Sequence, residues 1–562
     1  MIRPIALLLV ITSLWFPANG VQAEWQVWTT TQTRRVLREE PAGSALAVEL
    51  SAARNEWQSF QILLNADEPI GGITVVPGDL VGPEGAVLRA SDGGLYRQHQ
   101  FHIQKGSLRN GAFIPGWYPD GLIPFLHPLT GKPLQGARLQ AVPFDLPPYQ
   151  THGFWADIYV PAGAKPGLYR GTYRITAAGG KAVEIPVSFT VWDFELPAFP
   201  TMKTNFGGPA RHIRRYYRAR AAEGKDTDVA DVQALELQCA KMLSELHISA
   251  MPNQRIEPTA GRDGSFYFSD AEIRAWREAL DEYHPSALWV VHPNTVIKDP
   301  ERQRSKLQAW LAAFDEAAKK LNRPQVLFYT YLVDEPGDLA AFEMVRKWGR
   351  VIREAKSAVK VMVTTHPVAH PEWGNLFGAV DIWCTSFAEF SQAAAEKRQA
   401  LGETIWIYTC LCTGDKKSPW WQTDFPLLHY RVPAWIMWHY RIRGLLYWGG
   451  ASHWDAVEDP WTDPQTHRVG DLVFNGEGSM TYPGRAVGYE GLAPSLRLKA
   501  IRDSIEDYEY LAILERLGLD AEAEKVVTPL AGSFHQWDPD PAAYETARAK
   551  LAQMIIAATR PQ

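Results

Sequence analysis

Residues 327–336 read LFYTYLVDEP, an apolar and aromatic run that ends in two adjacent carboxylates and a proline. The apolar part is typical of a buried strand. A helical pattern follows from Asp338 to about Ala355. A (β/α) barrel presents its catalytic groups in this order, because they lie where the carboxyl ends of the strands lead into helices. The stretch therefore predicts a barrel with Asp334 and Glu335 at its catalytic face.

The chain beyond Pro200 alternates short apolar runs with amphipathic segments. We expect strands at residues 203–206, 248–251, 287–292, 326–333, 359–365, 380–385, 404–410 and 444–448. Helical patterns lie between most of these runs, which predicts a parallel sheet. Eight such units in about 250 residues favour a (β/α)8 barrel. The first two runs are the weakest, so an incomplete or distorted barrel is the alternative.

The tail of the chain is expected to be helical. Residues 494–517 have the pattern of one long helix, and residues 518–562 look helical with an irregular insert at 532–541. We expect residues 518–562 to pack outside the barrel as a C-terminal extension.

Residues 24–198 carry β signals without a long helical period. Strands are expected at residues 56–64, 154–160, 169–176 and 183–192, the last two joined by Gly179-Gly180 as a hairpin. This spacing predicts an antiparallel β-sandwich. The segment LPAFP at 196–200 ends the domain, because its two prolines favour an extended linker. The sequence thus predicts a multidomain β and α/β chain, with a sandwich at 24–198 and a catalytic domain at 199–562.

The first residues have the features of an export signal. Arg3 precedes an apolar core at residues 5–16, and Val21-Gln22-Ala23 predicts cleavage after Ala23. We expect residues 1–23 to be removed and the protein to be periplasmic or secreted. No later stretch reaches transmembrane length. The net charge of −6 is spread along the chain, without the basic stripe that is typical of nucleic-acid binding.

The cysteine pattern predicts neither a disulfide framework nor a metal site. Cys239, Cys384, Cys410 and Cys412 are few for a chain of 562 residues, and we interpret them as buried thiols. No His/Cys pair lies at ligand spacing from the last two. We expect no metal and no cofactor.

Two carboxylates adjacent in sequence constrain the chemistry. Side chains of neighbouring strand residues point to opposite faces, but a turn at the strand end would let both enter one pocket. Ordinary retaining glycosidases take their two carboxyls, about 5–5.5 Å apart, from separate positions, whereas an adjacent pair fits substrate-assisted cleavage of a 2-acetamido sugar. Asp334 would orient the acetamido group, and Glu335 would be the acid and then the base. The alternative is helix capping, because acids and a proline also favour a helix start.

Other residues near the expected strand ends are candidates for binding sugar. Aromatic rings stack on sugars, and histidine and asparagine can hold hydroxyls, although each could equally be structural. The 22 tryptophans of the chain are compatible with such a surface. The candidate substrate-binding residues are His292, Asn294, Tyr331, His366, Trp383, Tyr408, Trp448 and Trp454.

Short motifs are spread along most of the chain. They are ARNEWQSFQ at 53–61, YPD at 118–120, LIP at 122–124, VP at 160–161, GLYRG at 167–171, YLVDEP at 331–336, GEG at 476–478, YPG at 482–484, PSLR at 494–497 and EDYEYL at 506–511. Together these motifs resemble glycoside hydrolase family 123. The resemblance implies an N-terminal β-sandwich, a (β/α)8 catalytic domain and retaining β-N-acetylgalactosaminidase activity. It also implies that Asp334 and Glu335 are the catalytic pair.

Three functions are compatible with these residues. The first is an exported glycosidase that releases β-linked N-acetylgalactosamine or a related N-acetylhexosamine from a glycolipid glycan or a glycosaminoglycan-type oligosaccharide. The second is a retaining glycosidase for a sugar without the acetamido group, with Asp381 or Glu389 as a separate nucleophile. The third is a non-catalytic carbohydrate-binding protein, because a fold does not fix a function.

Overall fold

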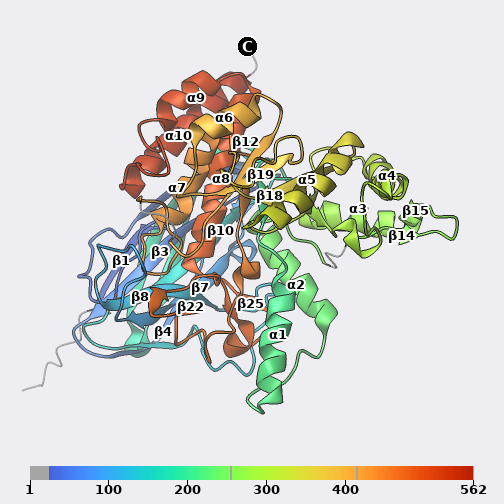
Figure 1. Ribbon diagram of the computed structural model, residues 1–562. Coiled ribbons are helices and arrows are strands. Elements are labelled where there is room, and N and C mark those ends of the chain that lie inside the picture. Colours follow the sequence, from blue (N-terminus) through green and yellow to red (C-terminus); the bar gives the residue numbers. More distant parts are fainter. Residues whose placement is uncertain (1–24, 253–255, 413–415, 561–562) are drawn as a thin grey trace, which may run out of the picture.

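The computed structural model describes residues 25–252, 256–412 and 416–560. Within these ranges a β-rich N-terminal region lies beside a mostly parallel near-barrel that carries helices (Figure 1). The predicted export signal, residues 1–23, lies outside the described residues.

The N-terminal region is built from two packed sheets. One has the strand order β1–β3–β10–β7–β8 and the other β2–β12–β11–β4–β9. Their bounds are β1 Trp25–Thr31, β2 Val48–Arg54, β3 Glu56–Ala66, β4 Ile70–Val76, β7 Gly94–Ile103, β8 Gly116–Pro124, β9 Phe144–Leu146, β10 His152–Val160, β11 Gly167–Thr176 and β12 Ala182–Glu195, with short strands β5 Leu80–Val81 and β6 Val87–Leu88 at the side. The inward faces of both sheets form one core that includes Phe60, Phe154 and Ile175.

The predicted hairpin is confirmed as β11 and β12, with Tyr173 opposite Ile185. Strand pairs in this region are antiparallel except one, since β2 and β12 run parallel. Two packed, mainly antiparallel sheets agree with the predicted sandwich, and β2–β12 is the one parallel pair among the described strands of this region.

The near-barrel has seven parallel strands in the order β13–β21–β20–β19–β18–β17–β16. Their bounds are β13 Lys203–Asn205, β16 Ala287–Val290, β17 Leu327–Tyr331, β18 Val359–Thr364, β19 Ile382–Ser386, β20 Thr404–Tyr408 and β21 Gly444–Leu446. The helices between them are α1 Pro209–Ala222, α2 Val232–Ser244, α3 Asp270–Tyr283, α4 Arg304–Leu321, α5 Leu339–Glu354, α6 Gln392–Gln399 and α7 Leu428–His439. Alternate strand residues such as Tyr329 and Met362 fill the interior, and their neighbours face the helices.

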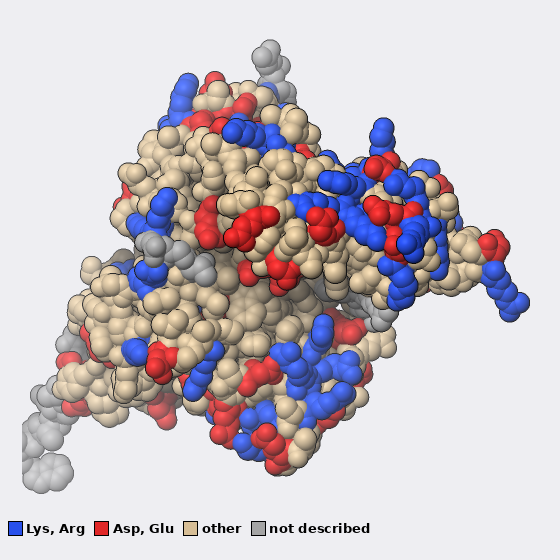
Figure 2. All heavy atoms as spheres, in the orientation of Figure 1, with Lys and Arg blue, Asp and Glu red and all other residues tan. Residues whose placement is uncertain are grey.

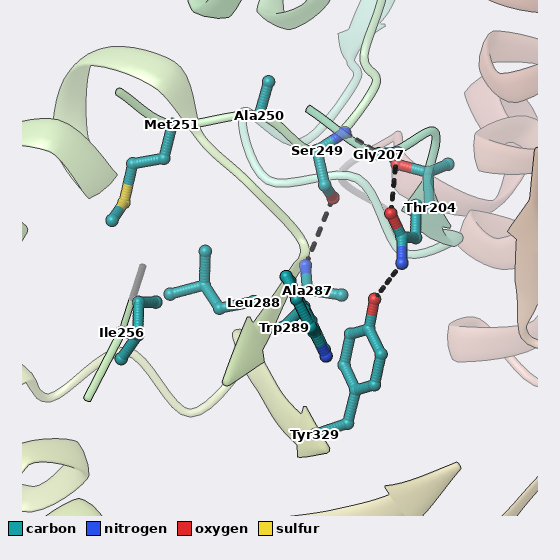
Figure 3. A pocket seen from close by; sticks show the side chains of 11 residues that line it. Thr204, Gly207, Ser249, Ala250, Met251, Ile256, Ala287, Leu288, Trp289 and Tyr329 are labelled. Carbon is teal, nitrogen blue, oxygen red and sulfur yellow. Dashed lines mark hydrogen bonds between the residues drawn. The ribbon is translucent and has the colours of Figure 1, made fainter. Parts of the chain in front are cut away.

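The strand predicted at residues 248–251 is not formed. Ser249 lies between β13 and β16, where it donates its backbone N–H to Thr204 Oγ1 at 2.7 Å and accepts at Oγ from Ala287 N at 3.2 Å (Figure 3). Side-chain hydroxyls thus satisfy backbone groups that a sheet ladder would otherwise pair. The described residues therefore form a near-barrel, and the prediction of eight strands is corrected to seven.

The predicted long C-terminal helix is confirmed as α8, Leu496–Arg516, and is followed by α9, Asp520–Val527, and α10, Pro541–Thr559. Helix α8 is buried along nearly its whole length. Its Arg502 pairs with Asp157 of β10, and its Glu506 accepts from the backbone of Trp57 in β3 at 2.9 Å. On another side, Ser504 donates to the carbonyl of Arg431 in α7. This helix therefore joins the sandwich to the near-barrel, while α9 and α10 pack against it.

The remaining predictions concern cysteines and membrane spans. All four cysteines are free thiols; Cys239, Cys384 and Cys412 are buried as expected, whereas Cys410 is half-buried because it lines a cleft at the strand ends. The residues that the structure describes hold no group of three or more His, Cys, Asp or Glu that could bind a metal ion. Among these residues no helix combines the length and apolarity needed to span a bilayer.

Candidate active site

The acidic pair lies in the loop that follows β17. The strand ends at Tyr331, and Glu335 adopts a left-handed backbone conformation with φ of 41°. This conformation is uncommon for a residue with a side chain. It turns the chain so that Asp334 and Glu335, although adjacent, line the same cleft at the carboxyl ends of the strands. The backbone N–H of Glu335 donates to Thr364 Oγ1 at 2.7 Å, which fixes the turn on the neighbouring strand β18.

Asp334 is held by two hydroxyl groups on the same oxygen. Tyr331 donates to Oδ1 at 2.5 Å, and Thr364 donates to the same atom at 2.9 Å. Burial and the hydrogen bond to Asp334 raise the pKa of Tyr331, so the phenol keeps its proton and remains a donor. The second oxygen, Oδ2, accepts no hydrogen bond from any described residue and is available to a ligand.

Glu335 has a different partner from a different strand. Tyr408, the last residue of β20, donates to Glu335 Oε1 at 2.5 Å. Burial, with the hydrogen bond to Glu335, raises the pKa of Tyr408, which therefore stays a donor as well. Within the described part of the chain Oε2 has no hydrogen-bond partner. The two carboxylates thus present one unoccupied oxygen each from two separately anchored groups.

The helix-capping alternative is answered by the next residues. Helix α5 begins after Asp338, whose Oδ1 accepts from the backbone N–H of Ala341 at 2.8 Å. Asp338 is therefore the N-cap. Asp334 and Glu335 lie outside the helix and face the cleft instead.

Trp448, just beyond β21, is the aromatic wall of the cleft. Its indole N–H donates to Glu477 Oε1 at 2.7 Å. Glu477 is fully buried, and its other oxygen accepts from the backbone N–H of Leu411 at 3.0 Å and from the Gln422 amide. Burial raises the pKa of Glu477. This carboxyl group therefore fixes the plane of the indole ring and ties it to the 410–412 loop.

The structure brings some of the predicted residues together. Tyr331, Tyr408 and Trp448 line the cleft with the acidic pair. His366 lies at the end of β18, where Nε2 contacts Glu389 at 2.6 Å and Nδ1 contacts Thr385 at 2.7 Å. It is therefore at the correct end of the sheet, in a polar cluster next to the cleft.

Four other predicted sugar contacts do not line the cleft. Trp383 faces outward to the helices and donates to Glu403 at 2.7 Å, because its neighbours in β19 occupy the inward positions. Trp454 is fully buried and donates to the carbonyl of Thr481. His292 packs against Trp348, and its Nδ1 accepts from the backbone N–H of Asn294. Trp383, Trp454 and His292 therefore pack within the fold, whereas Asn294 is exposed outside the cleft.

The two alternative nucleophiles also differ in position. Asp381 precedes β19 and pairs with Arg353 at 2.9 Å, so it lies at the amino ends of the strands, opposite to the acidic pair. Glu389 follows β19 at the carboxyl end, where it is engaged by His366.

Sequence reasoning missed Thr364 and Glu477. Thr364 contacts both Asp334 and Glu335, and Glu477 accepts a hydrogen bond from the Trp448 indole N–H. Thr364 ends its strand next to the predicted Thr365-His366, so its position was a usable signal. Glu477 lies in the GEG motif of the resemblance but carries no local sign of burial.

Comparisons with known proteins find a matching family and a solved structure with a similar fold. Residues 290–514 match the family described as glycoside hydrolase 123, catalytic domain. A solved structure of a family 123 glycoside hydrolase from Clostridium perfringens, described in terms of glycolipid glycan hydrolysis, is 14% identical with a TM-score of 0.63; the similarity covers 95% of this chain and 97% of that one. At this identity it supports the fold alone. No curated protein sequence matches the chain.

Other solved glycosidases resemble the chain only distantly. A family 39 glycoside hydrolase from Bacteroides cellulosilyticus is 9% identical with a TM-score of 0.28, over 84% of this chain and 82% of that one. A Bacteroides ovatus GH5 xyloglucanase is 9% identical with a TM-score of 0.22, over 85% of this chain and 100% of that one. Similarity at these scores carries no argument about this chain.

A carboxylate pair in a cleft at the strand ends, together with the family match, defines the class of protein: the chain is a glycoside hydrolase. Residues 290–514 are the part of it that matches the catalytic domain of glycoside hydrolase family 123.

Proposed function

We propose that the enzyme is exported and releases β-linked N-acetylgalactosamine, or a related N-acetylhexosamine, with retention through an oxazoline intermediate. The observation that carries the proposal is the pair of adjacent carboxylates in one cleft, each anchored through one oxygen and unoccupied at the other. Adjacent carboxylates suit a reaction in which the substrate supplies its own nucleophile. The apolar N-terminal stretch supports export.

In the first step the acetamido carbonyl oxygen of the substrate attacks C1 while the bond from C1 to the leaving oxygen breaks. Asp334 Oδ2 would accept a hydrogen bond from the acetamido N–H and stabilise the positive charge that develops on the amide. Glu335 Oε2 would give its proton to the leaving oxygen. Tyr331 and Thr364 keep Asp334 in position for this role.

In the second step water attacks C1 of the oxazoline, and its proton passes to Glu335, which regains its starting state. The C1–O bond of the oxazoline breaks and the acetamido group is restored. Two displacements at C1 retain the configuration. Trp448, held by Glu477, offers the apolar face on which a sugar ring can stack.

The test compares three variants of neighbouring acids. Asp334→Asn and Glu335→Gln should each lower kcat on an aryl β-N-acetylgalactosaminide by several powers of ten, because each removes a group that acts on the transition state. Asp338→Asn is the matched control, since asparagine caps helices as well as aspartate does. Its activity and melting temperature should stay near those of the parent protein. Full activity in both site variants would refute the assignment.

The choice of sugar is tested with aryl β-glycosides of N-acetylgalactosamine, N-acetylglucosamine and galactose. Cleavage of the N-acetylated sugars alone, with inhibition by an N-acetyl thiazoline, is the expected result. Cleavage of the galactoside would favour a protein nucleophile instead, and Glu389 is the carboxylate at the correct end of the sheet to provide one.

A further inference from the structure

Helix α1 forms the wall of the cleft across from the strand ends, and it is rich in arginine. Figure 2 shows this face hollowed near its centre, with acidic side chains along the upper rim and many basic side chains over α1 below. Arg211 and Arg214 of this helix line the same cleft as Asp334 and Glu335. They are three residues apart and so share one face of the helix.

The five arginines of α1 differ in whether they have a carboxylate partner. Arg215 pairs with Asp455, Arg218 with Asp228 at 3.4 Å, and Arg220 with Asp226 at 3.7 Å. None of these three lines the cleft. Arg211 and Arg214 do line it, and no carboxylate within the described residues lies within 4 Å of either guanidinium. The unpaired arginines are thus those that a ligand in the cleft would meet.

The position of Arg211 is electrostatically unfavourable, and an anionic ligand would offset that cost. Arg211 lies in the first turn of α1, where the aligned peptide dipoles disfavour a cation. The neighbouring histidines do not add charge, because burial lowers the pKa of His212 to about 4 and also lowers the pKa of His467. At neutral pH the two guanidinium groups are therefore the source of positive charge on this wall. Guanidinium groups match carboxylate and sulfate geometry through paired N–H donors.

We propose that Arg211 and Arg214 form a subsite for an anionic group of the glycan, a carboxylate or a sulfate ester, so that the enzyme prefers acidic over neutral N-acetylhexosamine-containing oligosaccharides. This inference rests on the proposed function for the sugar that is cleaved. It adds a specificity determinant on the opposite wall of the same cleft.

The experiment uses three matched oligosaccharides. In each, a β-linked N-acetylhexosamine is joined to a neutral hexose, to the corresponding hexuronic acid, or to the neutral hexose with a sulfate ester on the N-acetylhexosamine. We expect kcat/KM for at least one anionic substrate to exceed the neutral value about tenfold or more at low salt, and the preference to shrink as ionic strength rises. The two anionic arms distinguish carboxylate from sulfate.

Variants assign the preference to these residues. The double change R211Q/R214Q should lower kcat/KM for the preferred anionic substrate by about ten- to hundredfold, as expected for lost charged hydrogen bonds, with the neutral substrate unaffected. R218Q is the control, because it removes the same charge from the same helix outside the cleft. Equal kcat/KM for all three substrates, or an equal effect of R218Q, would overturn the proposal.

Binding separates this inference from the proposed function. Calorimetry with Glu335→Gln and the same three oligosaccharides reports affinity without turnover. Suppose that the parent enzyme cleaves none of the three oligosaccharides, but that Glu335→Gln binds an anionic one more tightly than the neutral one. If adding R211Q/R214Q to Glu335→Gln then removes that difference in affinity, the proposed reaction fails and the anion subsite stands. Equal affinity for neutral and anionic oligosaccharides would refute the subsite whatever the outcome for catalysis.

Discussion

Glu477→Gln is the change with the most specific expected result. Glu477 Oε1 accepts from the Trp448 indole N–H, while Oε2 accepts from the backbone of Leu411 and from Gln422. Glutamine has one oxygen and one NH2 group where glutamate has two oxygens. Its NH2 group must therefore lie against hydrogen-bond donors, either on the Trp448 side or on the Leu411 side. If NH2 faces Trp448, the indole N–H is left unpaired, whereas the Tyr447 hydroxyl, 3.5 Å from Oε1, can accept from that NH2. The reverse orientation leaves two donors unpaired, the Leu411 backbone N–H and the Gln422 amide, and neither can become an acceptor. The amide should therefore turn its NH2 toward the indole ring.

The magnitude follows from that count. One buried donor without a partner costs about 1–3 kcal/mol. Part of this cost is offset, because burial raises the pKa of Glu477 and its charge is itself unfavourable there. We therefore expect the free energy of unfolding to fall by about 1 kcal/mol. Because Trp448 loses its anchor, KM for the glycoside should rise about three- to tenfold, which is the scale of one aromatic contact.

The assay is a double-mutant cycle read by KM and by thermal melting. Trp448→Phe keeps an aromatic ring but lacks the indole N–H. If Glu477 acts by positioning Trp448, then Glu477→Gln should raise KM in the parent protein and have little further effect in the Trp448→Phe background. Independent, additive effects on KM would refute the positioning role.

Three more predictions address separate features. Tyr408→Phe removes the hydroxyl that holds Glu335 and should lower kcat about tenfold without a change in melting temperature, as measured by steady-state kinetics. Arg497→Met removes the 2.9 Å partner of the buried Asp120 carboxylate, which keeps Arg35 at 3.5 Å, and also removes the donors to the carbonyls of Gly476 and Ser479. It should destabilise the protein by about 3 kcal/mol in urea unfolding. Burial lowers the pKa of His99 to about 4 from 6.5 in the unfolded chain, so its contribution to stability is present above pH 6.5 and lost as the pH falls toward 4. His99→Gln should flatten the melting temperature over that range.

Much of the fold could be predicted because apolar runs and helical periods are local properties. The runs around Phe328 and Val361 gave strands where the structure has them. The run at 248–251 did not, because Ser249 satisfies its neighbours through side-chain hydroxyls, which four residues of sequence do not reveal. Predicting whether a strand joins a ladder requires knowledge of its partners in space.

The site could be predicted in part for a related reason. Asp334 and Glu335 stood out because two acids interrupt an apolar run. Trp383 was selected as an aromatic residue in a strand, but the alternation of the strand places it outward, and its register depends on adjacent strands. Glu477 and Arg214 could not be found from the local sequence, because their roles depend on their surroundings. Hydrogen-bond donors surround Glu477, and no carboxylate of the described residues lies within 4 Å of the Arg214 guanidinium.

Helix α8 has a consequence for how the polypeptide reaches its final form during synthesis. Its side chains contact strands β3 and β10 of the N-terminal sheets and helix α7 of the near-barrel, and it is translated after all three. Neither domain can complete its packing until residues 496–516 have emerged. Ribosomes that stop short of this helix should therefore yield chains that proteases degrade, which makes enzyme abundance sensitive to premature termination even when every active-site residue has been translated.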